Sequence, residues 1–430
     1  MHNRPRSFSR PERALSTVVL AALVAFAGGV GFAQPAVVPV GTLFDYTGAL
    51  AEFGPAHQNA AEMAAAQLNA AATEVFGGPI IRLIHEDSAT SAASGVDRAR
   101  KLVDADGVPA IVGSLASGVT INVAESVTVP AQVLQISPAS TSPLLSVLDD
   151  DGYLFRTTSS DALQGVVAAQ LAIGEIIDDY AFTRAATIYE NSPYGQGLSN
   201  AFAAAFEARG GTVTAQVAHP TEPQPTYASQ LEQVFAGGPE VVLAIGYPGQ
   251  ATVYLAEARD LFGFTNFQYV DGTQSELIID VMGDDVEGRY GTSPGSDPEW
   301  PGFQQYVADF EALYGERPPL PFMDSAYDAV VVIGLAIAKA YVDGTEVTGT
   351  SLRDNVRVVS NPPGQVVGVN DFVTAFSLLE AGEDIAYSGA ASDVGFDDVG
   401  DVITAVEIWR YVGGTIVSEM TRTADVIPAE

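Results

Sequence analysis

Short apolar runs alternate with amphipathic segments along most of the chain, and this alternation limits the possible folds more than any other feature. Segments between the runs carry apolar residues at helical spacing, as in 92–103, where Val96, Ala99 and Val103 share one face. Eight runs have the length and composition of buried strands, at 37–43, 80–85, 110–113, 133–137, 185–189, 213–217, 241–245 and 268–270. The pattern predicts an α/β fold of parallel sheets with right-handed helical crossovers.

Local signals place helices between and after these strands. Pro55 begins a helix predicted over 55–68, and Gly210-Gly211 ends another at 195–209. Further helices are predicted at 227–235, 251–262, 298–314, 324–341 and 351–359. Near the C-terminus, segments 402–411 and 415–418 flank Gly413-Gly414, which predicts a hairpin. A length of 430 residues favours two domains.

The first 33 residues have the pattern of an export signal. Four arginines precede an apolar run at 18–30, and small residues at 31–33 suggest cleavage near Ala33. The apolar run is shorter than the roughly 20 residues that span a membrane. We therefore predict a soluble protein outside the cytoplasm, in the periplasm.

Composition excludes several classes of function. The sequence has no cysteine, so disulfides, thiol catalysis, thiolate metal sites and a lipid-modified cysteine are ruled out. Lys and Arg number 19 against 53 Asp and Glu, a formal net charge of −34. Such a surface repels nucleic acid and anionic membranes and favours a monomer. A salt-rich habitat, where screening weakens self-repulsion, is our hypothesis for this charge.

Two small polar turns follow neighbouring predicted strands and form the best candidate for a ligand site. Ser117-Gly118 comes after strand 110–113 and begins a helical segment, and the turn 137–141 follows strand 133–137. The carboxyl ends of parallel strands are where open α/β sheets bind small ligands. Hydroxyls and free backbone N–H groups there suit a carboxylate or phosphate.

Several motifs, in this order and spacing, resemble those of the periplasmic substrate-binding proteins of ATP-binding-cassette (ABC) importers, in the branched-chain amino-acid branch (leucine/isoleucine/valine-binding type). The motifs are VGTLFDYTG at 40–48, EFG at 52–54, IVGS at 111–114, ISPAST at 136–141, YENSPYGQG at 189–197, DG at 271–272, YDA at 327–329 and FD at 396–397. The resemblance covers almost the whole chain after the signal.

This resemblance implies a type I periplasmic-binding fold: two Rossmann-like lobes joined by three hinge crossings, with the ligand cleft between them. Lobe 1 would comprise residues 36–156 and 293–389, and lobe 2 residues 157–292 and 390–430. The resemblance also implies capture of a small amino acid, branched-chain or similar aliphatic, and its delivery to an ABC permease in the inner membrane.

The resemblance also assigns site residues. Ser117 and Thr141, with backbone groups of Gly118, Ala139 and Ser140, would bind the ligand carboxylate. Helix capping and an ordinary turn hydroxyl are the alternatives for the two side chains.

Four further residues complete the predicted site. Asp271 would bind the ammonium or else cap a turn, and Tyr194 and Tyr247 would close the cleft or else pack internally. Phe53 would line the side-chain pocket or anchor its loop.

Other functions have weaker support from the sequence. The same fold can serve a sensor that presents an amide, urea or an aromatic or aliphatic carboxylate to a receptor. No nucleophile elbow, zinc-protease motif or phosphate-binding loop occurs, so we predict no enzyme, no metal and no cofactor.

Overall fold

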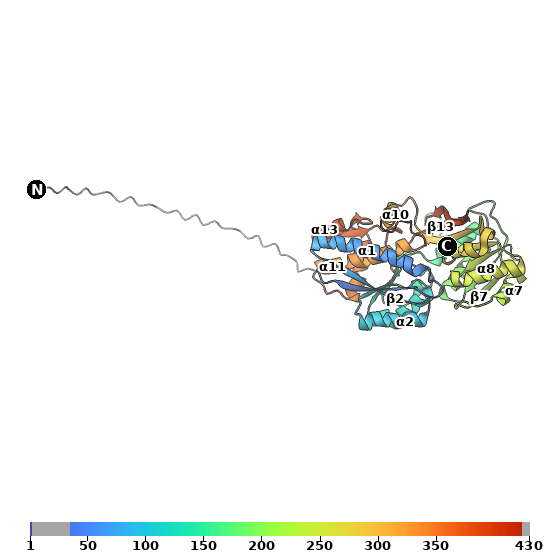
Figure 1. Cartoon of the computed structure of the whole chain (residues 1–430), viewed down its shortest axis with the longest axis horizontal. Coiled ribbons are helices and arrows are strands. Elements are labelled where there is room, and N and C mark those ends of the chain that lie inside the picture. The colour runs from blue at the N-terminus through green and yellow to red at the C-terminus, as the bar shows by residue number, and fades with distance from the viewer. Residues whose placement is uncertain (2–34, 424–430) are drawn as a thin grey trace. The chain divides into compact units, whose positions relative to one another are not determined.

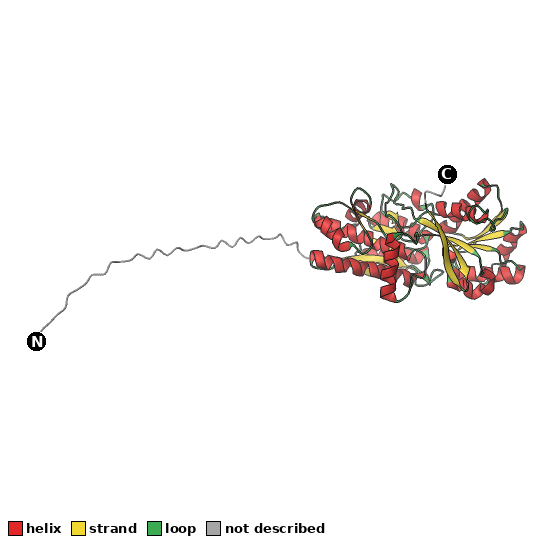
Figure 2. Cartoon of the chain, turned by 90° about the horizontal axis from the view of Figure 1, so that it is seen from above, coloured by secondary structure: helices red, strands yellow, loops and turns green. Residues whose placement is uncertain are grey.

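Two separate β-sheets organise the chain, and both consist largely of parallel strands. The computed structural model describes Met1 and residues 35–423. Apart from Met1, the predicted signal peptide lies outside the described residues. Helices flank both sheets (Figure 2), so the predicted α/β class is confirmed.

The first sheet has five parallel strands in the order β2-β1-β3-β4-β5. Helices α1, α11 and α13 pack together beside this sheet (Figure 1). The strands are β1 (Val38–Phe44), β2 (Ile81–Asp87), β3 (Ala110–Gly113), β4 (Leu134–Ser137) and β5 (Leu154–Arg156). The helices of this half are α1 (Phe53–Phe76), α2 (Ala92–Arg100), α3 (Ser117–Val123), α4 (Val129–Ala131), α10 (Pro301–Tyr314), α11 (Met323–Val342), α12 (Gly349–Ser360) and α13 (Phe372–Glu380).

The second sheet has seven strands in the order β14-β13-β10-β9-β8-β6-β7, with antiparallel pairing only at the β10–β13 and β13–β14 contacts. Its strands are β6 (Arg184–Glu190), β7 (Thr212–His219), β8 (Val241–Ile245), β9 (Phe267–Val270), β10 (Tyr290–Gly295), β13 (Ala405–Val412) and β14 (Thr415–Arg422). Its helices are α5 (Asp161–Ala172), α6 (Pro193–Ala208), α7 (Ala228–Ala236), α8 (Pro248–Phe262) and α9 (Glu276–Met282). Strands β11 (Gln365–Val367) and β12 (Ile385–Tyr387) form a small parallel pair elsewhere.

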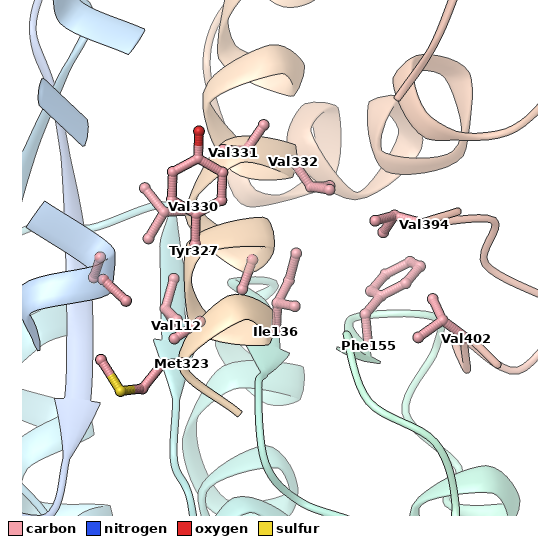
Figure 3. Close-up of a cluster of buried hydrophobic side chains, with 14 of the residues drawn as sticks. Val112, Ile136, Phe155, Met323, Tyr327, Val330, Val331, Val332, Val394 and Val402 are labelled. Atoms are coloured by element: carbon pink, nitrogen blue, oxygen red, sulfur yellow. The ribbon is translucent and has the colours of Figure 1, made fainter. Parts of the chain in front are cut away.

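Helix α11 forms the centre of the core beside the first sheet. Its Met323 and Tyr327 lie near Val112 of β3 and Ile136 of β4 (Figure 3). α11 is the one described helix that is long and apolar enough to cross a membrane, but most of its surface is buried inside the protein. The position is that of a core helix, because α1, α12 and α13 pack against it.

The chain passes between the two sheets near three places: after β5, after β10 and between β12 and β13. Residues 290–293, where the predicted boundary between the two lobes falls, belong to β10, which pairs with both β9 and β13. The chain therefore leaves the second sheet after Gly295. The lobe boundaries given above remain a prediction.

Buried Arg156 ties the first of these passages to the third. Its Nε donates to Asp401 Oδ1 (2.7 Å), and one of its terminal nitrogens donates to the other oxygen of the same carboxylate. The other terminal nitrogen donates to the carbonyls of Ser140 (3.3 Å) and Ser142 (3.0 Å). One guanidinium thus holds the polar turn after β4 in place through hydrogen bonds to two of its carbonyls.

Candidate functional site

The candidate site is a small cavity between the carboxyl ends of the two sheets. In the described conformation its free space is about 20 Å³, room for about one water molecule, so binding of a larger solute requires its walls to move apart. The first half of the chain and the β6–β9 region both contribute to its wall. The lining residues are Leu50, Phe53, Leu115, Ser117, Ala139, Tyr194, Tyr247, Asp271, Gly272 and Phe322.

Six predicted site residues, distant in sequence, meet at this cavity because each follows a strand or begins a helix at the carboxyl end of its own sheet. Ser117 begins α3 after β3, and Ala139 lies in the turn after β4. Tyr194, Tyr247 and Asp271 follow β6, β8 and β9, which are neighbours in the second sheet. The sixth, Phe53, is the first residue of α1 and is buried.

Ser117 does not cap its helix. The N-cap position of α3 is Ala116, and the Ser117 hydroxyl instead accepts a hydrogen bond from the backbone N–H of Ser142 (3.2 Å). This bond joins the two polar turns, so they form one surface at the cavity wall.

The other three predicted residues lie close by but outside the lining. The Ser140 hydroxyl is buried and bonds to Thr120 Oγ1 (2.8 Å) and to the carbonyl of Leu115 (3.1 Å), so it supports the turn internally. Thr141 is buried, and its hydroxyl has no hydrogen-bond partner within residues 35–423. Gly118 borders a neighbouring, more polar cleft of about 220 Å³. Roles for these three residues in ligand binding stay predictions.

Asp271 lies on the opposite wall, where neutral donors hold its carboxylate. Gln164 Nε2 donates to Asp271 Oδ1 at 2.7 Å, and the Tyr194 hydroxyl donates to the same oxygen at 3.0 Å. Burial raises the pKa of Asp271 to about 6, although these two hydrogen bonds act to lower it. Its second oxygen is not used by these donors.

The two tyrosines form a stacked pair beside Asp271. The rings of Tyr194 and Tyr247 are 5.5 Å apart between centroids and nearly parallel, at 5°. Burial raises the pKa of both hydroxyls well above the usual value, so both remain neutral. Gly272 completes this wall: a Cβ there would lie 2.3 Å from the carbonyl oxygen of Gly246 and 3.0 Å from the Tyr194 hydroxyl.

The remaining wall is apolar. Leu50, Leu115 and Phe322 join Phe53, and each is at most 5% exposed. Sequence reasoning missed these three. Leu115 could have been found, since it lies between the β3 strand and Ser117. Phe322 carries no local signal, because the fold brings it from a remote segment and holds it at φ 65° before α11.

Asp161 is a second acid that sequence reasoning missed. It is the first residue of α5, after the N-cap Ser160, and it is fully buried. A serine followed by an acid at a helix start is a recognisable signal, but we predict no helix at that place from the sequence. The Thr141 hydroxyl lies near enough to lower the pKa of Asp161, although the two groups do not meet with hydrogen-bond geometry.

Side-chain hydroxyls connect the two halves at two points around the cavity. The Ser142 hydroxyl donates to the carbonyl of Pro193 (2.9 Å), and the Ser275 hydroxyl donates to Glu52 Oε2 (2.6 Å). The described conformation therefore has the two halves in direct contact at the cavity rim.

The cavity has donors on one wall, an acid on the other and an apolar side, an arrangement that could hold a small polar solute. The periplasmic binding protein family matches residues 37–374, so the chain belongs to that family. The family and the similar proteins are solute-binding proteins, not enzymes.

Three similar proteins illustrate the relationship. The chemotactic signal transduction system substrate-binding protein BasB of Halobacterium salinarum is 26% identical over 403 residues, which cover 89% of this chain and 87% of BasB. Leu/Ile/Val-binding protein homolog 1 of Brucella suis is 30% identical over 289 residues, 66% of this chain and 74% of that protein. The crystal structure of leucine-binding protein LivK from Thermotoga maritima has a TM-score of 0.74 at 22% identity and covers 90% of this chain and 99% of LivK. The similarity to LivK is a similarity of fold.

Proposed function

We propose that this protein captures an aliphatic α-amino acid, with the branched-chain amino acids as first candidates, and delivers it to an ABC permease from the periplasm. One observation carries the proposal: Ser117 and Asp271 face one small cavity from opposite walls, and the rest of the wall is largely apolar. The names of the similar Leu/Ile/Val-binding and leucine-binding proteins support the same class of ligand.

The walls match the groups of such a ligand. Its carboxylate accepts hydrogen bonds from the Ser117 hydroxyl and from backbone N–H groups of the turns after β3 and β4. Its ammonium donates to Asp271, beside the tyrosine pair. Its side chain contacts Leu50, Phe53, Leu115 and Phe322. A hydrocarbon wall separates leucine from valine by only about 1–3 kcal/mol per methylene, so the order of preference has to be measured.

A thermal-shift screen tests this proposal. The purified protein is heated with each of the twenty amino acids, then with 4-methylpentanoate, benzoate and urea. A ligand at 100 times its dissociation constant stabilises the folded state by about 2.7 kcal/mol. We expect branched-chain amino acids to raise the melting temperature and 4-methylpentanoate, which lacks the amino group, to do so far less. Stabilisation by benzoate or urea alone would refute the proposal.

The Asp271→Asn variant locates the ammonium. It should lose more affinity for the amino acid than for the carboxylic acid with the same carbon skeleton, because only the amino acid carries a positive charge. Asp150→Asn, which changes an acid that does not line the cavity, is the control. Equal losses for both ligands in Asp271→Asn would contradict the assignment.

Sensing is the second candidate function, and the likeness to BasB over most of both chains favours it. In that case the ligand-bound form contacts a receptor rather than a permease. Uptake of radiolabelled leucine and chemotaxis toward leucine in a deletion strain distinguish the two. Loss of uptake supports delivery to a permease, and loss of chemotaxis alone supports sensing.

A further inference from the structure

The three passages between the sheets are hydrogen-bonded to one short segment, residues 322–328, which starts just before α11 and includes the beginning of that helix. In the first passage, directly after β5, the Thr157 hydroxyl donates to the carbonyl of Ser325 (2.8 Å). In the second, directly after β10, the Ser296 hydroxyl donates to Asp324 Oδ2 (2.5 Å). Two passages that are far apart in the sequence therefore meet the same turn of one helix.

The third passage, after β12, is bonded one turn further along the same helix. The backbone N–H groups of Ala390 and Ala391 donate to the two carboxylate oxygens of Asp328, at 2.7 and 2.8 Å. The approach is close: a Cβ at Gly389 would lie 2.5 Å from Asp328 Oδ2, so a side chain there would push the carboxylate aside. The Ser296 hydroxyl oxygen is also 3.2 Å from the carbonyl oxygen of Ala391, which places the second passage against the third.

This network is shielded from water. Thr157, Ser325 and Asp328 are at most 3% exposed, and Ser296 and Asp324 are at most 8% exposed. A buried donor or acceptor that loses its partner is costly, because water does not replace the lost bond. Since all three passages share the start of α11, a movement of the two halves about the passages has to rearrange several of these bonds together.

The same segment reaches the cavity. Phe322 is the residue before α11, it lines the cavity wall, and it is 5% exposed. Its backbone is left-handed, at φ 65° and ψ 4°, a conformation that a bulky residue keeps only where its surroundings impose it. Asp328 lies six residues after Phe322, about 9 Å along a helix, so one short element extends from the cavity wall to all three passages.

We propose that residues 322–328 are positioning residues for ligand capture, because they couple contact at Phe322 to the arrangement of the three passages. This inference rests on the proposed function and deepens it. The cavity has room for about one water molecule, so a guest side chain has to shift the wall at Phe322, and this shift reaches the bonds of the passages through α11. Packing of the guest against Phe322 favours the closed arrangement, in which the halves touch at the rim and the passages are bonded to α11.

This coupling makes closure depend on the side chain of the guest. Glycine has the same carboxylate and ammonium as leucine but no side chain that could contact Phe322. A ligand shifts the equilibrium between the open and closed arrangements only by the difference in its affinity for the two. At saturation, glycine should therefore leave a larger fraction of molecules open than leucine does.

Single-molecule energy transfer between two dyes tests the proposal, because the chain has no cysteine and takes labels only at cysteines that are introduced. Glu74→Cys on α1 and Glu232→Cys on α7 place one dye on each half, at exposed positions. The closed fraction is measured without ligand, with saturating L-leucine and with saturating glycine, and calorimetry gives the dissociation constants. We expect L-leucine to close nearly all molecules and glycine to close fewer.

Thr157→Val keeps the shape of the side chain, removes the donor and does not change the cavity lining. We expect about two- to tenfold weaker binding of L-leucine and incomplete closure at saturation, since the closed arrangement lacks one of its bonds. Thr157→Ser, which keeps a hydroxyl, should recover most of both.

Two further variants complete the experiment. Thr128→Val is the matched control: Thr128 is also buried and donates to Gln135 Oε1 (2.6 Å), so its loss should lower stability in urea unfolding and leave closure unchanged. Phe322→Ala should lower the closed fraction with L-leucine to that found with glycine. Circular dichroism checks that each variant is folded.

The possible failures are distinguishable. If Thr157→Val closes as completely as Thr128→Val with saturating L-leucine, or if glycine closes as many molecules as L-leucine, the coupling is refuted and the proposed function stands. The comparison of glycine with L-leucine needs no variant at the passages, so it decides the question even where such a variant does not fold. If no amino acid binds, both proposals are refuted.

Discussion

Replacement of Arg156 by methionine should destabilise the protein strongly, although Arg156 does not line the cavity. Its side chain is only 1% exposed, and its guanidinium holds Asp401, the Ser146 hydroxyl and two carbonyls of the turn after β4. Methionine fills a similar volume but supplies no donor. The Asp401 carboxylate, itself only 16% exposed, then loses its cationic partner.

The size of this loss of stability follows from the carboxylate and the carbonyls that remain without a partner in Arg156→Met. Breaking a buried ion pair by removing one partner costs about 3–5 kcal/mol, and each carbonyl left without a donor can cost about 1–3 kcal/mol. These costs overlap, because the turn can shift to reach water. We therefore expect the free energy of unfolding to fall by about 3–5 kcal/mol, and ligand affinity to fall as well, since the turn between Ala139 and Ser142 loses its support.

Urea unfolding followed by circular dichroism measures the free energy of unfolding, and calorimetry with the best ligand from the screen measures the affinity. Arg100→Met is the matched control: Arg100 lies 3.9 Å from Asp97 in an exposed pair that should contribute less than about 1 kcal/mol. A loss below about 1 kcal/mol for Arg156→Met would refute the reasoning, because the guanidinium would then contribute no more than a surface pair. The double variant with Asp401→Leu should lose less than the sum of the two single changes.

Three further predictions concern single residues. Ser117→Ala should weaken binding of a carboxylate ligand by about 1.5–3 kcal/mol in calorimetry, and unchanged affinity would remove Ser117 from the site. Gly272→Ala should abolish measurable ligand binding in the thermal-shift screen, because the new Cβ meets the carbonyl of Gly246; binding at normal affinity would contradict the described backbone. Burial raises the pKa of Asp328 from 3.8 to about 7. The protonated Asp328 carboxyl therefore contributes fully to stability below pH 4, and this contribution is lost as the pH rises through 7. In urea unfolding, Asp328→Asn should reduce the free energy of unfolding less at pH 8 than at pH 5. An equal reduction at both pH values would refute the raised pKa.

Much of the fold could be predicted because local patterns and tertiary packing agree in it. Strands β3 and β8 occupy the predicted ranges, and the β13–β14 hairpin turns at Gly413-Gly414, both at positive φ. Helix α1 extends well beyond its predicted range, to Phe76, since its alanines give weak periodicity although many are buried. Strand β5 is only three residues long, too short for a pattern to reveal.

Helix α5 was missed for a different reason. It is buried on nearly every side, so its sequence lacks the polar face on which a helical prediction depends. The site residues likewise divide into those that local sequence patterns reveal and those that they do not. Ser117 and Asp271 follow predicted strands, and strand ends are visible in the sequence. Phe322 and Asp161 reach the cavity region only through the packing of distant segments, which no local pattern encodes.

The two contacts at the cavity rim have a kinetic consequence. Ser142 is bonded to Pro193 and Ser275 to Glu52, so separation of the two halves to release a guest molecule requires both contacts to break. Its residence time is then governed by how often these contacts break. A change at Ser275, which does not line the cavity, would alter how long the protein stays loaded.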